Sequence, residues 1–586
     1  MVAAYSQFDY IFAIGTIFAF LDAWNIGAND VANSWASSVS SRSISYFQAM
    51  CGASMMEFAG ALGVGGRVAD TIRTKIVDID AFEESPALLM LGMVCATIAS
   101  SVYLTMATKL GMPVSTTHSI LGGVLGMGVG ALGGRGITWI GYNSNGSVDI
   151  TQGVVQVFLA WIIAPCMSGF FASSIFLMTK YGVLLSKNPV MRGLFLVPVY
   201  FMVTAGLIVM LLIWKGGDYE VNLTESQIPG VIVAAGALWG ILMAIFLVPW
   251  MYRVVVKEDW QLKGWHIIQG PFLLRRGEVP PPPADFQGAV RNFYEGHLTR
   301  EELDARRAQE NQDAETGQAA TQEGSEDEKK VADGEASSQE EAPAPTSTYK
   351  SMIGPKPDAT WYTAAGLWWY FKWALLRGVD RDIVASQKDK SIVGGDIEEI
   401  HSRATHFDNK AEFLYTFLQV MTAASASFVH GANDVANAIG PYATVYQIWS
   451  KGNVPGGQSP VPLWILAFGG AGIVIGLWTY GYNIMKNLGN RVTLMSPARG
   501  FCMELGSVIT VVVATRLKLP VSTTQCITGA IVGVGLCNGD WRAINWRMVA
   551  WIYLGWFITV PTAGLISGCL MGFITNAPTW ATGPAN

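Results

Sequence analysis

The chain has 586 residues, of which 51% are hydrophobic and only 14% are charged. Average soluble domains carry roughly 25% charged residues, so this composition excludes an ordinary soluble domain and predicts an integral membrane protein. The net charge of −6 does not indicate a nucleic-acid partner, because most of the charged residues lie in one central segment.

Apolar runs long enough to cross a bilayer, about 20 residues each, occur about twelve times along the chain. They are 8–35, 44–65, 86–108, 113–133, 152–180, 191–214, 229–252, 410–440, 462–485, 497–517, 520–537 and 546–575. The predicted fold class is therefore an all-α polytopic membrane protein with about 12 transmembrane segments. The short glycine-rich segments after residues 113 and 520 leave re-entrant hairpins open as an alternative to full crossings.

Two sequence strings occur twice. Gly27-Ala28-Asn29-Asp30-Val31-Ala32-Asn33 returns unchanged 404 residues later, and Pro113-Val114-Ser115-Thr116-Thr117-His118 returns 407 residues later as Pro520-Val521-Ser522-Thr523-Thr524-Gln525. The nearly equal offsets indicate one duplicated unit. If every apolar run crosses, an odd number separates the two copies, which predicts the inverted-topology repeat common in secondary transporters, with broken helices or hairpins at the midplane.

The domain organisation follows from this duplication. We expect a first transmembrane repeat (1–185), connecting helices (186–252), a large central segment (253–409) and a second repeat (410–586). The central segment begins with basic residues, which places it in the cytoplasm by the positive-inside rule and both termini outside. Its acidic tract from Glu301 to Glu341 is predicted to be disordered, whereas the aromatic stretch 361–373 is predicted to lie in the membrane interface as a helix.

Two sequons and two histidines belong to the predicted loops. Asn145 and Asn222 begin glycosylation-type triplets, and both fall in loops that the same topology places outside the cell. His401 and His406 lie in the central polar segment and are interpreted as solvated side chains.

The Pro-Val-Ser-Thr-Thr strings have the residues of a helix start. Proline suits the first helical position and Ser or Thr the N-cap, and an apolar helical run follows each string. A helix that begins inside the membrane presents unpaired N–H groups and a partial positive charge, so two such ends facing each other would hold a small oxyanion. The alternative is that the hydroxyls only bond back to their own helices.

The Gly-Ala-Asn-Asp-Val-Ala-Asn strings place a carboxylate inside a membrane span, which costs roughly 2.5 to 3.5 kcal/mol at its centre. Glycine and asparagine around it predict a local break of the helix that exposes carbonyl oxygens. These are hard oxygen ligands, suited to sodium or to a proton on the aspartate. A buried Asp–Asn pair that only fixes helix packing is the alternative. None of the four strings contains Lys or Arg, so a bound anion would need co-bound cations.

Other polar residues inside the spans are assigned separately. Glu57 and Glu504 stand at different distances from the repeated strings, so they are not symmetry-related, and each is expected to line the pathway or to pair locally. Asp22 and His430 have no counterpart in the other half and are interpreted as local.

With these motifs the chain resembles the inorganic phosphate transporter (PiT) family, and most closely its fungal plasma-membrane sodium/phosphate symporters. The resemblance covers residues 8–252 and 410–575 and includes the contexts of Glu57 and Glu504. It implies a phosphate site formed by Ser115, Thr116, Thr117, Ser522, Thr523, Thr524, Asn29 and Asn433. It implies sodium sites at Asp30, Asn33, Asp434 and Asn437, and roles for Glu57 and Glu504 in transport.

The expected function is a symporter that imports inorganic phosphate on the sodium gradient by alternating access. Proton coupling, sulfate as the anion, and a phosphate-sensing receptor are the alternatives. The chain lacks a nucleotide-binding Gly-Lys-Ser/Thr loop and a nucleophile–base set, so neither an enzyme nor an ATP-driven pump is expected. Phosphate, sodium and the lipid bilayer are the expected partners, with no cofactor beyond sodium, no nucleic acid, and a homodimer left open.

Overall fold

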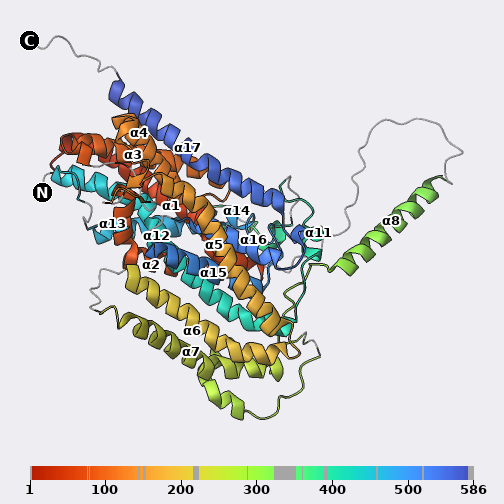
Figure 1. The fold of residues 1–586 in the computed structure, drawn as a ribbon. Coiled ribbons are helices and arrows are strands. Elements are labelled where there is room, and N and C mark those ends of the chain that lie inside the picture. Colours follow the sequence, from red (N-terminus) through yellow and green to blue (C-terminus); the bar gives the residue numbers. More distant parts are fainter. Residues whose placement is uncertain are drawn as a thin grey trace, which may run out of the picture.

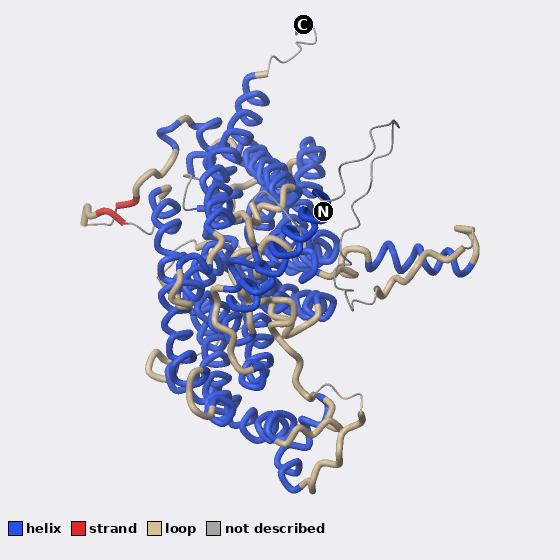
Figure 2. Tube along the Cα trace, turned by 90° about the vertical axis from the view of Figure 1, so that its right-hand side faces the viewer, coloured by secondary structure: helices blue, strands red, loops and turns tan. Residues whose placement is uncertain are grey.

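The computed structural model describes residues 3–577 except 75–76, 78–79, 143–144, 150–152, 216–222, 285, 287, 323–350, 359, 389–392, 457–459 and 518–520. Long helices dominate this part of the chain, which confirms the predicted fold class (Figure 1). Figure 2 shows a small hairpin of strands at the periphery, β1 (Gly141–Tyr142) antiparallel to β2 (Val148–Asp149). The sequon residue Asn145 is exposed in the turn between them, and Asn222 lies outside the described residues.

Most helix ends lie within a few residues of the predicted runs, but α2 and α12 continue well beyond the predicted ends at residues 65 and 440. The first half contains α1 (Asp9–Ser40), α2 (Tyr46–Thr74), α3 (Pro86–Lys109), α4 (Thr116–Leu132), α5 (Val155–Thr179), α6 (Pro189–Lys215) and α7 (Ile228–Met251). The second half contains α12 (Asn409–Lys451), α13 (Leu463–Tyr480), α14 (Tyr482–Met485), α15 (Pro497–Arg516), α16 (Thr523–Leu536) and α17 (Trp546–Asn576). Between them lie α8 (Arg300–Gln322), α9 (Ala364–Leu376), α10 (Ile383–Ser386) and α11 (Ile397–Ser402).

The packing of these helices repeats between the two halves. In each half a long helix with the Gly-Ala-Asn-Asp string packs on the second helix of the other half, as α12 does on α2 and α1 on α13. Likewise α17 packs on the pair α3–α4, and α5 packs on the pair α15–α16. The two repeats therefore interlock, while α6 and α7 form an additional pair along one side (Figure 1).

The pairs α3–α4 and α15–α16 are hairpins that turn inside the protein. α3 runs alongside α1 in the same direction, because Val94 lies near Gly15 and Thr105 bonds Asn25. It ends at the level of Asn29, which bonds Thr108. α4 then turns back with 17 residues, which span about 25 Å, less than the roughly 30 Å of a hydrocarbon core. The pair α15–α16 runs likewise from the start of α12 to the centre and back. Both pairs therefore turn back near the centre of the bundle, which favours the re-entrant alternative over two full crossings.

The count of twelve crossing segments is not confirmed. Among the described residues eight helices are long and apolar enough to cross a membrane, within the ranges 6–40, 86–109, 155–184, 189–214, 228–256, 463–480, 497–514 and 546–576. α4 and α16 are shorter apolar helices, and α2 and α12 are long but more polar. In Figure 1 the N-terminus and the end of α17 lie at one end of the bundle and α8 at the other, which agrees with termini and central segment on opposite sides.

The predicted break at the Gly-Ala-Asn-Asp strings is wrong, because α1 and α12 run through them as continuous α-helices. The glycines instead permit close helix contacts. A Cβ on Gly27 would lie 1.9 Å from the Ile473 carbonyl oxygen, and one on Gly431 would lie 2.2 Å from the Glu57 carbonyl oxygen. These contacts also show that Glu57 and Ile473 occupy equivalent positions in the two repeats.

The central segment is more ordered than predicted at its ends. The tract expected to be disordered from Glu301 begins instead as α8, whose arginines pair with Asp396, Glu398 and Glu399. Residues 323–341 of that tract lie outside the described residues. The aromatic stretch predicted near 361–373 is helical as α9, and its position in the membrane interface stays a prediction.

One histidine of the central segment is buried rather than solvated. His401 is 2% exposed, its Nδ1 lies 3.0 Å from His297 Nδ1, and its Nε2 donates to the Asn490 carbonyl at 2.6 Å. Burial lowers the pKa of His401 to about 4 and that of His297 to about 2, so both rings are neutral at pH 7. The pair joins the central segment to the loop before α15.

Candidate functional site

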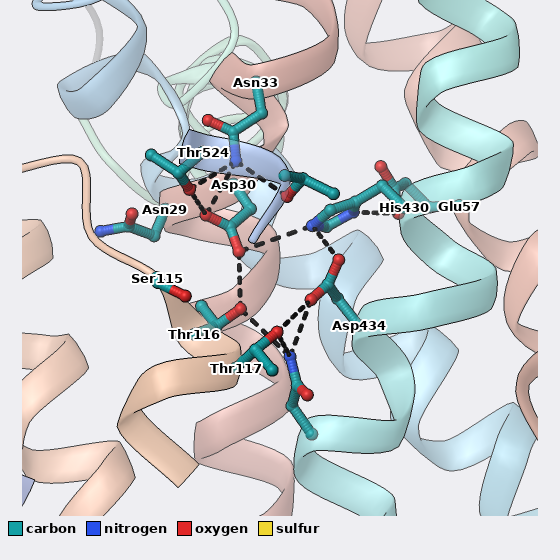
Figure 3. A network of polar contacts seen from close by, with 12 residues as sticks. Asn29, Asp30, Asn33, Glu57, Ser115, Thr116, Thr117, His430, Asp434 and Thr524 are labelled. Atoms are coloured by element: carbon teal, nitrogen blue, oxygen red, sulfur yellow. Dashed lines mark hydrogen bonds and ion pairs between the residues drawn. The ribbon is translucent and has the colours of Figure 1, made fainter. Parts of the chain in front are cut away.

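The four repeated strings meet at one place in the middle of the bundle (Figure 3). Asp30 on α1 and Asp434 on α12 are 1% and 3% exposed. The tips of the two hairpins touch there, because the Thr524 hydroxyl donates to the Val114 carbonyl at 3.0 Å. The site therefore lies where two long helices cross the starts of α4 and α16.

The asparagines that end the strings link each long helix to the hairpin of the other repeat. Asn33 Nδ2 donates to the hydroxyls of Thr523 at 3.3 Å and Thr524 at 2.9 Å. Asn437 Nδ2 donates to the equivalent first-repeat hydroxyls, those of Thr116 at 3.3 Å and Thr117 at 3.1 Å. This twofold pattern was not visible in the sequence, which cannot tell contacts within a repeat from contacts between repeats.

The Asp30 carboxylate accepts bonds from both repeats. One oxygen accepts from the Thr116 hydroxyl at 2.7 Å. The other accepts from Asn33 Nδ2 at 3.1 Å and, at 3.2 Å, from the Thr524 hydroxyl, which shares its single proton between Asp30 and the Val114 carbonyl. The hydroxyl of Thr116 belongs to the same repeat as Asp30, and that of Thr524 to the other. Asp30 therefore holds both hairpin tips.

Asp434 repeats part of this arrangement and leaves an acceptor free. Its Oδ1 accepts from Thr117 at 3.1 Å and Asn437 at 2.8 Å. Its Oδ2, like Asn33 Oδ1, is buried without a hydrogen-bond partner among the described residues. Pro441 lacks an N–H, so the Asn437 carbonyl also loses its ordinary helical donor. Unpaired buried acceptors are rare in folded proteins, and these oxygen atoms could ligate a cation.

His430 lies at the centre of this cluster, although the sequence interpretation treated it as local. Its Nδ1 donates to Glu57 Oε2 at 2.7 Å, and its Nε2 lies 3.5 Å from Asp30 Oδ2 and 3.4 Å from Asp434 Oδ2. Repeat symmetry could not find it, because the equivalent residue is Ile26. The helical spacing could have done so, since residues 430 and 434 share one helix face.

Asp30, His430 and Asp434 form the one group of three or more His, Cys, Asp or Glu side chains in the described part of the chain with metal-ligand spacing. Two hard carboxylates, the amide oxygens around them and a single imidazole do not resemble a thiolate or multi-histidine transition-metal site. These oxygen ligands suit an alkali cation. A proton bound to His430 is the other positive charge that the cluster could hold.

Comparison with known proteins agrees with this arrangement. The model of the phosphate transporter family matches residues 26–567. The chain belongs to this family. It is 62% identical to the phosphate-repressible phosphate permease pho-4 of Neurospora crassa over 98% of this chain and 99% of that protein. It is 27% identical to the human sodium-dependent phosphate transporter 2 over 92% and 94% of the two chains.

A solved structure titled as the sodium-dependent phosphate transporter shares the fold. Its TM-score is 0.59 at 23% identity, and the match covers 97% of this chain and all of that one. Family membership confirms the resemblance inferred from the repeated strings. It also makes the chain a membrane transporter rather than an enzyme.

In this transporter the remaining predicted acids lie on either side of the central cluster. Glu57 accepts from His430 and, at 2.9 Å, from Ser427, so it belongs to the site through the histidine. Glu504 accepts from Ser37, Ser38 and Thr422 at 2.5 to 2.7 Å, about one helical turn beyond Asn33. Glu504 therefore joins α15 to α1 and α12 outside the cluster.

Four predicted anion ligands are engaged differently from Thr116, Thr117, Thr523 and Thr524. Ser115 caps α4 by accepting from the His118 N–H at 3.2 Å, whereas the equivalent Ser522 makes no capping bond. Asn29 bonds the residues before α4, donating to Met112 and accepting from the Val114 N–H, which favours a positioning role. Asn433 is partly buried.

Proposed function

We propose that the chain is a secondary active symporter that imports inorganic phosphate across the plasma membrane on the sodium gradient. The observation that carries this proposal is the pair of helix starts, α4 and α16, brought together between Asp30 and Asp434. Helix starts attract an oxyanion, and buried carboxylates attract cations, so each ligand favours the binding of the other. The chain matches proteins named phosphate permease and sodium-dependent phosphate transporter, which supports both ligands.

We place phosphate between the hairpin tips, within reach of the first-turn N–H groups and the hydroxyls of Thr116, Thr117, Thr523 and Thr524. Sodium ions are placed at the Asp30–Asn33 and Asp434–Asn437 pairs. No Lys or Arg contacts these residues in the described part of the chain, and the one basic side chain there is His430. A single imidazole between two carboxylates does not balance a bound anion, so we assign the remaining positive charge to sodium. This requirement is the physical basis of coupling.

Alternating access follows from the two hairpins, which reach the site from opposite ends of the bundle. Movement of one hairpin would open the site to one side while the other keeps it closed. We propose that the termini face the outside and that the central segment faces the cytoplasm. The sequons at Asn145 and Asn222 then face the outside.

Uptake of labelled phosphate into proteoliposomes tests this function. An inward sodium gradient should accumulate phosphate above its equilibrium level, whereas equal potassium should not. A proton gradient that drives uptake as well as sodium does would support the proton-coupled alternative. Binding without uptake would support a receptor.

Phosphate selectivity should depend on the proton that the anion carries. Phosphate near pH 7 retains at least one proton, and Asp30 or Asp434 as a carboxylate can accept its hydrogen bond, whereas sulfate offers no such donor. A site that pairs with a ligand donor discriminates against an analogue without it by up to several orders of magnitude. In competition assays arsenate should therefore inhibit uptake strongly and sulfate weakly. Equal inhibition by both would show that the acids do not recognise the protonated anion.

Loss of the hairpin hydroxyls should weaken phosphate binding. Thr116→Ala and Thr523→Ala each remove a donor that can serve a charged acceptor, worth about 1.5 to 3 kcal/mol or roughly a ten- to hundredfold loss of affinity. The apparent KM for phosphate at saturating sodium measures the effect. Thr138→Ala, in the loop after α4, is the control. An unchanged KM in both site variants would place the anion elsewhere.

A further inference from the structure

A row of polar side chains joins α1 to α3 and leads from the N-terminal part of α1 to the central site. Asn29 Nδ2 donates to the Thr108 hydroxyl at 3.0 Å, and Asn25 Nδ2 donates to the Thr105 hydroxyl at 3.0 Å. One turn further from the centre, Ser101 lies 3.4 Å from Asp22. The row lies along the contact between α1 and α3.

Asp22 is the residue in this row that the site does not explain. It is 0% exposed, and its Oδ2 has no hydrogen-bond partner among the described residues. No basic side chain in that part of the chain acts on its carboxylate. An unpaired ionised carboxylate in a membrane interior is costly, so Asp22 requires a proton or a cation.

Two hydroxyls face this carboxylate. Ser101 Oγ lies 3.0 Å from the Phe18 carbonyl oxygen and 3.4 Å from Asp22 Oδ1, so its single proton goes to the nearer carbonyl and a lone pair remains beside Asp22. Ser100 is completely buried, and its hydroxyl acts on the Asp22 carboxylate without forming a well-aligned hydrogen bond in the described part of the chain. Two hydroxyls therefore lie beside one carboxylate, and their lone pairs are available to an ion.

The spacing of these oxygens favours a cation over a proton. A hydrogen bond to a protonated Asp22 would bring the oxygens to about 2.7 to 2.8 Å. The 3.4 Å between Ser101 Oγ and Asp22 Oδ1 is longer. Two oxygens that ligate one ion at about 2.4 Å, in octahedral directions, lie about 3.4 Å apart. Hard oxygen ligands with a single negative charge suit a monovalent cation.

The second repeat keeps a serine, Ser507, at the position of Ser100 but lacks the rest of this arrangement. Applying the repeat offsets to Asp22, Asn25 and Ser101 gives Ala426, Val429 and Val508. These three residues pack together in one apolar cluster with Val512 and Cys526. The polar row is thus present on the half of α1 that lies toward the N-terminus and absent from the corresponding half of α12.

We propose that Asp22, Ser100 and Ser101 form an additional sodium site, two helical turns or about 12 Å from Asp30. A sodium ion there lies on the same side of the central site as the N-terminal half of α1 and the start of the α3–α4 hairpin. The polar row connects it to the central site. This inference rests on the proposed sodium coupling for its role in transport. The binding of the ion does not depend on that coupling.

Sodium binding by the purified full chain tests the site directly. Equilibrium binding of ²²Na⁺ without phosphate should be weakened at least about tenfold at one site in Asp22→Asn, equivalent to about 1.4 kcal/mol. Ser100→Ala should shift the binding curve in the same direction by less. Asp9→Asn, an exposed acid on the same helix, is the control and should bind as the unaltered chain does.

In proteoliposomes the same Asp22→Asn change should raise the sodium concentration for half-maximal phosphate uptake by a similar factor, and higher sodium should restore uptake. Unchanged ²²Na⁺ binding in Asp22→Asn and Ser100→Ala would overturn the site. If Asp22→Asn does not fold, Ser100→Ala alone decides. Absence of sodium-driven uptake in the unaltered chain would instead contradict the proposed function.

Discussion

Asp30→Asn and Asp434→Asn are each expected to abolish sodium-driven phosphate uptake while the protein stays folded and in the membrane. Asp30 accepts hydrogen bonds from three side chains and Asp434 from two. Asparagine keeps the shape of the aspartate side chain but removes its negative charge. Its amide N–H groups would also face side chains that donate hydrogen bonds, which leaves those donors without an acceptor. Hydrogen bonds to charged groups contribute about 1.5 to 3 kcal/mol, so losing even one reduces affinity roughly ten- to hundredfold.

Initial rates of labelled phosphate uptake, normalised to protein in the membrane, measure this effect, with Asp9→Asn as the matched control. Near-normal sodium-dependent uptake in both site variants would remove these carboxylates from the mechanism. Failure of both variants to fold would favour a packing role for the Asp–Asn pairs.

The second large effect is expected at His430 and Glu57. His430 is the one basic side chain that contacts Asp30 and Asp434 among the described residues, and Glu57 holds its ring through a 2.7 Å bond. His430→Gln should reduce uptake at least about tenfold, because the imidazole between the two carboxylates is lost, and Glu57→Gln should do so by releasing the ring. Because the two residues act through one contact, the double variant should lose little more than either single variant.

A double-mutant cycle on the uptake rate measures this coupling. His266→Gln supplies a control, because the half-buried His266 lies in the central segment and its ring bonds Lys263 rather than the site. Costs that add in the Glu57→Gln/His430→Gln variant would show that the two side chains act separately. The second repeat offers a further comparison, because Ile473 occupies the position equivalent to Glu57 and Ile26 the position equivalent to His430. The double variant Glu57→Ile/His430→Ile tests whether an apolar pair supports uptake.

Much of this site could be predicted from the sequence because duplication marks it. A buried aspartate kept in two copies, with Ser-Thr-Thr strings at the same spacing, indicated a two-halved site. Apolar length predicted most helix ends within a few residues, but not the C-terminal ends of α2 and α12, which continue with more polar residues. Residues without a copy were harder to assign. His430 and Asp22 both have apolar counterparts, so symmetry gave no signal for either.

The errors have identifiable physical causes. Gly27 and Gly431 were expected to weaken their helices. Instead, the missing side chain lets each helix pack closely against the backbone of another helix. The start of the acidic tract was expected to be disordered from composition, yet salt bridges to α11 hold α8, such as that of Arg307 with Glu399. Which repeat each hydroxyl would contact depends on the interlocking of the halves, which no local pattern encodes.

Reciprocal flux tests the central claim most directly. If phosphate and sodium share one coupled site, a gradient of either should drive the other, because coupling free energies are reciprocal. Proteoliposomes with equal sodium on both sides and an inward phosphate gradient should therefore accumulate ²²Na⁺ transiently above its equilibrium level, and Asp434→Asn vesicles should not. A phosphate gradient that dissipates through the unaltered protein without moving sodium would contradict the account.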